Sequence, residues 1–338
     1  MSSNKYIVLS NQVYKEGQFS IAPIRFEDRY HIMKWRNEQI YHLRQSRLLN
    51  IEDQDAYFSN VVSKLFEQKE PNQILFSYLK GDECIGYGGL VHINWIDKNA
   101  EISFIMNTAL EETEFELHWQ NYLSLIKKVA FNELFLHKIY TYAFDLRPRL
   151  YSALELSSLK KEAVLYEHCL FGGKFKDVII HSCTNAIKLR GATLDDVNKT
   201  YEWAKDDVVR AFAFSKEDIT FENHENWFFN KLKSNNTLYF ILENVLNTSL
   251  GSIRIDADKN ENKWIISYLI DPNYHGKGLG TLILKLLEEK LNDFPESFKG
   301  RNLVGIVIPD NIASIKIFRK LGYSEEQVDN TYIFSKSI

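Results

Sequence analysis

One stretch constrains the fold of this chain more than any other: residues 264–291, which read WIISYLIDPNYHGKGLGTLILKLLEEKL. It begins with an apolar run of strand length at 265–270, and the Asp-Pro-Asn sequence that follows ends the strand. Glycines then occupy every second position (Gly276, Gly278 and Gly280), and apolar residues with helical spacing begin directly after them. A strand, a glycine turn and a helix in this order leave backbone N–H groups at the positive end of a helix dipole. The stretch therefore predicts an anion-binding turn.

Two phosphate-binding signatures do not fit this turn. GxxxxGK[ST] is excluded because Lys277 is followed by glycine, and GxGxxG is excluded because the run reads GxGxG. Taken alone, the segment is also compatible with an ordinary glycine-rich turn. The remainder of the chain has to separate these two interpretations.

The composition limits the classes of protein to which the chain can belong. Its 338 residues suggest two domains, and 45% hydrophobic with 25% charged residues is typical of a globular chain. A formal net charge of -4 gives no electrostatic footprint for nucleic acid, and no apolar stretch approaches the length of a membrane span. Cys84, Cys169 and Cys183 lack zinc-site spacing, so we expect reduced thiols, no metal and a cytoplasmic protein.

The first half of the chain repeats landmarks of the second half. Residues 102–107 (ISFIMN) match 266–271 (ISYLID) at an offset of 164, and the segment around Gly86 matches the one around Gly251 at an offset of 165. Landmarks in one order at nearly one spacing indicate two copies of one fold. The short polar join predicts two domains, 1–184 and 185–338.

Each copy is predicted to contain the same elements in the same order. A first strand is followed by helices, a pair of antiparallel strands, a central strand, a long helix, another strand, a helix and a final strand. The predicted strands include 20–24, 73–79, 84–92 and 138–144 in the first copy and 186–189, 238–244, 251–256 and 303–308 in the second, and the long helices are 115–131 and 280–291. This order predicts a mixed α/β (α+β) fold, with a twisted central mixed sheet flanked by helices in each domain.

A second motif follows the glycine turn, at residues 309–323, which read PDNIASIKIFRKLGY. Asn311 and Ser314 suit the start of a helix and Gly322 its end. Together the two segments resemble the hallmarks of the GNAT N-acetyltransferase superfamily. These are Gln/Arg-x-x-Gly-x-Gly/Ala after a strand and Asn-x-x-Ser/Ala-x-x-x-Tyr/Phe-x-x-x-Gly-Phe/Tyr, although the first position of the first motif is His275 here. The resemblance implies an N-acetyltransferase that uses acetyl-CoA as its acyl donor.

The resemblance also implies which residues hold acetyl-CoA. Backbone groups at the end of the central strand would meet the pantetheine arm and the thioester carbonyl, and the glycine turn would hold the pyrophosphate. The start of the last helix would lie along the pantetheine arm. The residues so implied are Leu269, Ile270, His275, Gly276, Lys277, Gly278, Leu279, Gly280, Thr281, Asn311, Ser314 and Phe318. Many relatives have Tyr where Phe318 stands, as the acid that protonates the leaving thiolate, and Phe cannot donate a proton.

The first copy differs from the second at the position of the glycine turn. After residue 107 it continues TALEETEFE, with four glutamates and no glycine. Like charges repel a phosphate at close range. We therefore expect the first domain to lack CoA binding and to be non-catalytic.

The catalytic and acceptor residues are less well marked than the CoA site. The usual strand carboxylate is not evident, so a general base must come from His224, Asp256, Glu225 or water. Trp203, Arg254 and Asp256 are predicted to bind the acceptor, because Arg254 and Asp256 share one face of a strand beside the central strand.

Three segments before the glycine turn, 201–206 (YEWAKD), 219–228 (ITFENHENWF) and 251–256 (GSIRID), resemble N-acetyltransferases of nucleotide-linked amino sugars from bacterial surface-glycan pathways. The resemblance implies a small-molecule acceptor, an amino-sugar nucleotide, and the composition argues against a nucleic acid, membrane or metal partner. The chain would be a monomer with pseudo-dimeric domains or a homodimer. Two alternatives remain: an N-acetyltransferase of protein N-termini or another small amine, and a non-catalytic acyl-CoA-binding scaffold.

Overall fold

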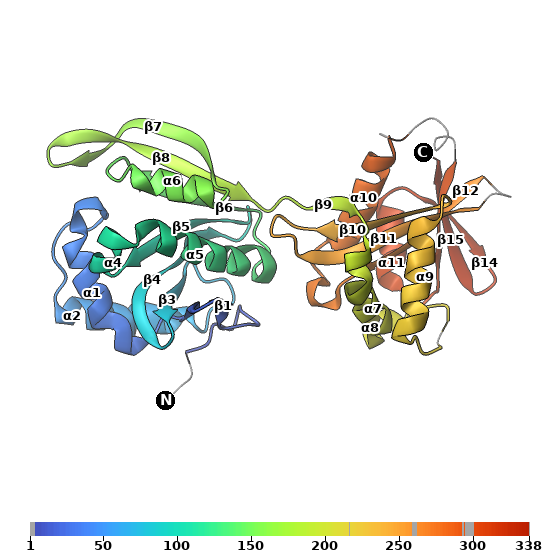
Figure 1. The fold of residues 1–338 in the computed structure, drawn as a ribbon, viewed down its shortest axis with the longest axis horizontal. Helices are drawn as coiled ribbons and strands as arrows, with labels where there is room; N and C mark the ends of the chain where they lie inside the picture. The colour runs from blue at the N-terminus through green and yellow to red at the C-terminus, as the bar shows by residue number, and fades with distance from the viewer. Residues whose placement is uncertain (1–3, 216, 259–261, 293, 295–300, 338) are drawn as a thin grey trace. The chain divides into compact units, whose positions relative to one another are not determined.

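Two mixed β-sheets, one in each half of the chain, form the framework of the protein (Figure 1). The structure is a computed structural model and describes residues 4–215, 217–258, 262–292, 294 and 301–337. The chain divides into two units, Met1–Asn185 and Ala186–Ile338, each with its own sheet and its own helices. The mixed α/β fold predicted for each half is confirmed.

In the first unit the strands lie in the order β1-β2-β3-β4-β5-β6-β8-β7. The strands are β1 (Tyr14–Glu16), β2 (Phe19–Pro23), β3 (Ile74–Lys80), β4 (Glu83–Asn94), β5 (Asn99–Met106), β6 (Lys138–Phe144), β7 (Lys160–Phe171) and β8 (Lys174–Thr184). The helices are α1 (Arg29–Glu38), α2 (Ile51–Tyr57), α3 (Ser63–Leu65), α4 (Thr108–Thr113), α5 (Phe115–Lys127) and α6 (Arg149–Leu156). The helix predicted over 115–131 continues beyond α5 as a π-helical turn, Lys128–Glu133.

In the second unit the strands lie in the order β9-β10-β11-β12-β13-β15-β14, read from the other edge. The strands are β9 (Lys188–Gly191), β10 (Thr237–Glu243), β11 (Ser249–Asp258), β12 (Lys263–Ile270), β13 (Asn302–Val307), β14 (Ser324–Val328) and β15 (Thr331–Ser337). The helices are α7 (Val197–Lys205), α8 (Asp207–Arg210), α9 (Phe221–Lys233), α10 (Leu279–Asn292) and α11 (Ile312–Lys320).

The two sheets share one strand order, as the internal repeat predicts. Strands β2 to β6 of the first unit correspond to β9 to β13 of the second, and a hairpin follows in both, paired through its second strand. The single final strand predicted for each copy is thus a hairpin. In the first unit this hairpin, β7 and β8, forms a long curved ribbon beside α6 (Figure 1).

Helices cover both faces of the second sheet. Tyr239 on β10 packs against Trp227 and Phe228 of α9, with ring centroids 6.3 and 5.3 Å apart. The next residue on the strand, Phe240, lies under the ammonium group of Lys290 on α10, 5.4 Å from its ring centroid. Because neighbouring residues on a strand point to opposite faces, α9 and α10 cover opposite sides of the sheet.

The central parallel pair of each sheet is only partly joined. In the first unit, β5 pairs with β6 over three residues, Asn99–Glu101 with Lys138–Tyr140. In the second unit, β12 pairs with β13 over four residues, from Lys263 to Ile266. The last residues of β5 and β12 lie beyond these pairings, so each sheet opens into a V at the carboxyl end of its central strand. This opening is the position that the fold offers to a ligand.

Candidate active site

The glycine turn follows β12 and leads directly into α10. Gly276 and Gly278 have φ angles of 75° and 79°, which residues with a Cβ rarely adopt. A Cβ on either glycine would meet no atom within 4 Å, and Lys277 between them is exposed. The turn is therefore open to solvent, and an anion could approach its N–H groups and the first turn of α10.

The third glycine has a different physical role from the first two. A Cβ on Gly280 would lie 2.6 Å from Cδ1 of Ile317, so this glycine lets α10 pack closely against α11. Thr281, the next residue, is half-buried in the first turn of α10, and Leu279 is buried. Nε2 of His275 lies 2.9 Å from the carbonyl oxygen of Ile270, so the imidazole lies against the end of β12.

Strand β12 leads into the V-shaped opening of the second sheet. Leu269 and Ile270 come after the last residue paired with β13, and both remain paired to β11. Their outer edge is thus available to a ligand that forms strand-like hydrogen bonds. The resemblance assigns these two residues to the same role.

The start of α11 lies beside the same strand. The side chain of Asn311 caps the helix by accepting a hydrogen bond from the backbone N–H of Ser314, with an N–O distance of 3.1 Å. The hydroxyl of Ser314 lies 2.9 Å from the hydroxyl of Tyr268, and either oxygen can donate. Sequence reasoning missed Tyr268. Its position on β12, two and four residues after the buried Ile266 and Trp264, places it on the same face of the strand as these residues, the face covered by α10 and α11.

Phe318 lies in the hydrophobic core of the second unit. It is 2% exposed, and its ring stacks on Phe334 with centroids 5.0 Å apart and an interplanar angle of 9°. A Cβ on Gly305 would lie 2.3 Å from Cζ of Phe318, so the ring sits directly on the backbone of β13. In the structure Phe318 packs under β13, and its contact with the cofactor stays a prediction.

A cavity of about 440 Å³ opens on the other face of the sheet, beside the end of β12. Its walls come from α7, α8 and α9, from the segment between α8 and α9, and from β10, β11 and β12. Aromatic side chains from α9 and β10, Trp227 and Tyr239, form part of the wall, and the carboxylates of Glu217 and Asp218 are exposed beside it. Ser267, Tyr268 and Leu269 of β12 also line the cavity. The cavity therefore reaches the end of β12 beside the V-shaped opening.

His224 lines this cavity and is 4% exposed, because α9 turns its apolar face to the sheet. Its Nε2 lies 3.0 Å from Oγ1 of Thr200, which also lies 2.9 and 3.1 Å from the carbonyl oxygens of Asp196 and Val197. Carbonyl oxygens only accept, so the Thr200 hydroxyl donates to one of them and accepts from Nε2–H. This assignment leaves the lone pair on Nδ1. Burial lowers the pKa of His224, which keeps the ring neutral near pH 7.

Arg254 and Asp256 lie on one face of β11, as their spacing predicts, and they bind each other. Nε of Arg254 donates to Oδ2 of Asp256 at 2.7 Å, and Asp256 also accepts from Lys231 at 2.8 Å and Thr237 at 2.7 Å. Burial by itself raises the pKa of Asp256, but these hydrogen bonds and the charge of Arg254 outweigh it and hold the pKa below its usual value. A carboxylate with a low pKa is a poor base, and Asp256 lies outside the set of described residues that line the cavity.

Two further candidates lie away from the cavity. Trp203 is 2% exposed and donates from its indole N–H to Oδ2 of Asp271 at 2.8 Å, so it anchors α7 to the end of β12. Glu225 is exposed on α9. Among the described residues that line the cavity, the predicted candidates are therefore His224, Arg254 and Leu269.

The first unit has no equivalent glycine turn among its described residues. Helix α4 occupies that place, and its Asn107 cap accepts from the backbone of Ala109. Of the four glutamates predicted to repel a phosphate, Glu111 is buried at 3% exposure and the other three are exposed. Oε1 of Glu111 lies 3.2 Å from Arg147 and 3.6 Å from Arg149, so the buried carboxylate is an internal ion-pair partner.

Within the part of the chain that the structure describes, no cluster of three or more His, Cys, Asp or Glu side chains could hold a metal ion. No described helix is both long and apolar enough to cross a membrane.

The chain resembles proteins of known activity over short parts of their length. It is 32% identical over 68 residues to a probable spermine N(1)-acetyltransferase of Bacillus subtilis subsp. natto, a match that covers 20% of this chain and 43% of the relative. A spermine/spermidine N(1)-acetyltransferase of Bacillus subtilis matches to the same extent. The chain thus spans less than half the length of these curated relatives.

Solved structures also resemble the chain. A spermidine N-acetyltransferase from Vibrio cholerae, in complex with CoA and spermine, matches with a TM-score of 0.44 and 18% identity over 50% of this chain and 96% of that one. A domain from Methanocaldococcus jannaschii matches with a TM-score of 0.40 and 23% identity over 46% of this chain and 99% of that one.

Family models match both halves of the chain. One model of an acetyltransferase (GNAT) domain matches residues 187–324, and another matches residues 21–147. The two matches together cover more than half of the sequence. The chain therefore belongs to the acetyltransferase (GNAT) family, with one domain of the family in each half.

Proposed function

We propose that the second domain transfers an acetyl group from acetyl-CoA to a primary amine of a small cationic acceptor of the polyamine type. The observation that carries this proposal is the cavity beside β12, whose lining includes Leu269 at the V-shaped opening, on the strand that leads into the glycine turn. A donor held along the opening and an acceptor in the cavity would meet at the end of β12. The three unpaired cysteines favour a reducing compartment, so we place the activity in the cytoplasm.

The donor would be held by the residues that the resemblance implies. The glycine turn, including Lys277, would bind the pyrophosphate through backbone N–H groups and positive charge. The outer edge of Leu269 and Ile270 would pair with the pantetheine arm, and Asn311 and Ser314 would flank it. A backbone N–H at this edge could also stabilise the oxyanion that forms on the thioester carbonyl.

The reaction needs one proton acceptor and one proton donor. The neutral amine nitrogen attacks the carbonyl carbon of the thioester, the C–N bond forms and the C–S bond breaks with its electron pair on sulfur. His224 is our candidate base, because its tautomer leaves the Nδ1 lone pair and its ring lines the cavity. Tyr268 is our candidate acid, because its hydroxyl lies beside Ser314, where the pantetheine arm would pass.

The acceptor class rests on the charges and rings of the cavity. The lining contains the acidic residues Glu217 and Asp218, which balance the charges of Arg210 and Arg254, and the aromatic residues Trp227 and Tyr239; carboxylates and aromatic faces both attract ammonium groups. A polyamine carries several amines, so one could react while another is held at the carboxylates. The relatives named for spermine and spermidine acetylation support the same class.

A nucleotide-linked amino sugar is the second candidate acceptor. Arg254 lines the cavity, and its guanidinium carbon lies 4.8 Å from the ring centroid of Trp227, where it could meet a phosphate. The ion pair with Asp256 offsets much of this charge, which makes the polyamine class the better match. A sugar amine is less basic than an alkylamine, which would favour it at a site with a weak base.

The acceptor class is tested by following acetyl-CoA turnover as free thiol release. The acceptors are spermidine, spermine, a nucleotide-linked 4-amino sugar and a peptide with a free N-terminus. We expect kcat/KM for spermidine to exceed that for the other two classes by at least about tenfold, or about 1.4 kcal/mol in transition-state binding. A higher value for the sugar nucleotide would select the second candidate, and CoA binding without turnover of any amine would indicate a scaffold.

The contribution of the two carboxylates can be measured separately. The double variant Glu217→Gln, Asp218→Asn should raise KM for spermidine about five- to tenfold with kcat nearly unchanged, because it removes ion pairs to a distal ammonium group. Glu222→Gln, on an exposed face of α9 outside the cavity lining, is the matched control and should leave KM unchanged. An unchanged KM in the double variant would remove the polyamine class from this site.

A further inference from the structure

The first domain keeps a cavity at the place where its own central strands part. The cavity measures about 430 Å³ and is lined by residues 102–105 of β5 and residues 141–144 of β6. These residues lie directly after the short parallel pairing of the two strands. The cavity is therefore in the V-shaped opening of a domain whose glycine turn is replaced by α4.

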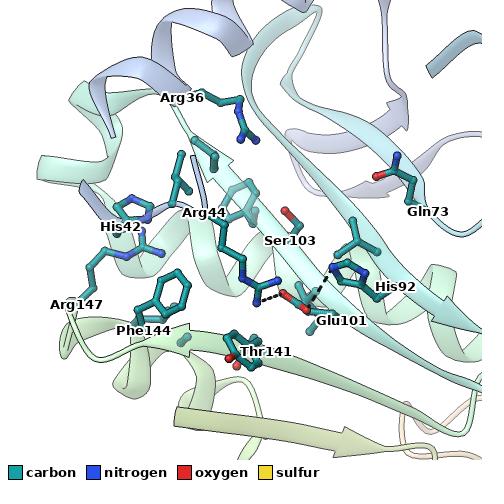
Figure 2. A pocket seen from close by; sticks show the side chains of 18 of the residues that line it. Arg36, His42, Arg44, Gln73, His92, Glu101, Ser103, Thr141, Phe144 and Arg147 are labelled. Atoms are coloured by element: carbon teal, nitrogen blue, oxygen red, sulfur yellow. Dashed lines mark hydrogen bonds and ion pairs between the residues drawn. The ribbon is translucent and has the colours of Figure 1, made fainter. Parts of the chain in front are cut away.

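The lining of this cavity is positively charged. It contains Arg36, Arg44 and Arg147 and a single carboxylate, that of Glu101, so its formal charge is +2 with histidines neutral. In Figure 2 the three arginines come from different segments around the cavity, with Arg44 directed toward Glu101 and Arg147 beside His42. The cavity of the second domain, by contrast, carries two arginines and two carboxylates and has a formal charge of zero. The linings of the two cavities thus differ in formal charge by two units.

Arg36 contributes the least compensated of these charges. Its Nη1 donates to the hydroxyl of Tyr87 at 2.6 Å and its Nε donates to the side-chain oxygen of Gln45 at 3.0 Å. Among the residues that the structure describes, Tyr87 and Gln45 accept these hydrogen bonds, and both are neutral partners of the half-buried guanidinium. The two neutral partners fix the orientation of the Arg36 guanidinium but do not offset its positive charge, so this charge is available to attract an anionic ligand.

The other two arginines are paired, but incompletely. Arg44 lies 3.2 Å from Glu101 and over the ring of Tyr142, 4.2 Å from its centroid. Arg147 shares the single buried carboxylate of Glu111 with Arg149, so two guanidinium groups face one carboxylate. The local excess of positive charge therefore includes Arg149, which does not itself line the cavity.

Two buried polar atoms on the cavity wall also lack partners. His42 is 7% exposed, and among the described residues its Nε2 has no hydrogen-bond partner. The indole N–H of Trp119, a residue that is 3% exposed, likewise has no acceptor within the described chain. A buried polar atom without a partner costs about 1–3 kcal/mol, and a ligand oxygen in the cavity could remove that cost.

We propose that this cavity binds a small organic oxyanion, a carboxylate or a phosphate ester, with an apolar or aromatic body. The guanidinium groups and the indole N–H would bind the oxyanion. Phe104, Trp119, Tyr142 and Phe144 line the same space and would cover the body of the ligand. A cationic amine, the acceptor class proposed for the second domain, would be repelled here, so the two sites are distinct.

The proposal is tested by calorimetry on the full chain, with benzoate and phenyl phosphate as probes and benzyl alcohol as the uncharged control. We expect one site per chain for at least one of the two anions, still present at saturating CoA, and at least tenfold weaker binding of the alcohol. The two anions distinguish a carboxylate site from a phosphate site. If neither anion binds more tightly than the alcohol, the proposal is overturned.

Variants locate the site. Arg36→Gln should weaken anion binding at least tenfold, because it removes a charge that offsets no carboxylate, and Arg36→Lys should recover part of the affinity. Arg47→Gln is the matched control, since this exposed arginine of the same domain pairs with Asp53 outside the cavity lining. Unchanged binding in Arg36→Gln, or loss of binding in Arg254→Gln of the second domain, would place the anion elsewhere and overturn the assignment. Thermal melting of each variant confirms that the chain remains folded.

Discussion

At the scale of single residues, the hydroxyl of Tyr268 lies 2.9 Å from that of Ser314, one helical turn before Phe318. If Tyr268 protonates the leaving thiolate, Tyr268→Phe should lower kcat at least about 10²-fold and leave the Kd for CoA nearly unchanged. Thiol release and calorimetry measure the two quantities. A variant that keeps its full kcat would show that the thiolate leaves without this acid.

Phe318 belongs to the same motif but should behave as a core residue. Its buried ring stacks on Phe334 and covers Gly305, so Phe318→Ala should lower the free energy of unfolding by about 3–5 kcal/mol. Denaturant unfolding of the full chain measures this loss. A loss below about 1 kcal/mol, together with a large fall in kcat, would instead assign Phe318 to the chemistry.

Asp256 gives a pH-dependent prediction. Its pKa is lower in the folded chain than the value of about 3.9 in an unfolded one, so its contribution to stability is fully present above about pH 4–5 and is lost as the pH falls through the folded pKa. Asp256→Asn should therefore destabilise the chain by about 1–3 kcal/mol at pH 7, because Lys231 and Arg254 lose a charged partner. Denaturant unfolding at pH 7 and pH 2.5 should show that the difference in unfolding free energy between the wild-type chain and Asp256→Asn is smaller at pH 2.5. An equal difference at both pH values would contradict the lowered pKa of Asp256.

At the scale of elements, the glycine turn and α10 form one unit that is open to solvent. Gly278→Glu should abolish CoA binding, because it places a carboxylate at the N–H groups of the turn and a side chain at a φ of 79°. The matched control is Gly173→Glu, whose glycine has a φ of 76° and equally open surroundings in the β7–β8 turn. Calorimetric titration with CoA should show binding to the control variant and none to Gly278→Glu. Thermal melting should give similar midpoints for the two variants.

At the scale of the whole molecule, the two domains share a strand order but differ at the site of the CoA pyrophosphate. The first domain replaces the glycine turn with α4 and the buried carboxylate of Glu111. Calorimetry of the full chain should therefore give one CoA site, which Gly278→Glu removes. Two sites of similar affinity would show that the first domain binds CoA by another route.

The sequence by itself determined the central strands and long helices, the duplication and the position of the glycine turn, but not the hairpin that ends each sheet. Alternating or continuous apolar runs indicated β5, β6, β12 and β13, because a strand repeats every two residues and its pattern survives in any tertiary context. Gly276 and Gly278 were recognisable because a positive φ is a local property of the backbone. Shared landmarks at one offset were sufficient to predict two copies of the fold.

Only the tertiary structure decided which side chains share a site. Tyr268 meets Ser314 across 46 residues, His224 meets Thr200 across 24, and Glu111 meets Arg147 across 36. The pairing of Arg254 with Asp256, and the burial of Trp203 against Asp271, likewise depend on neighbours that strand and helix periodicity does not specify. The physical reason is that periodicity fixes the face on which a side chain lies, whereas its charge state and its partners depend on the elements packed against that face.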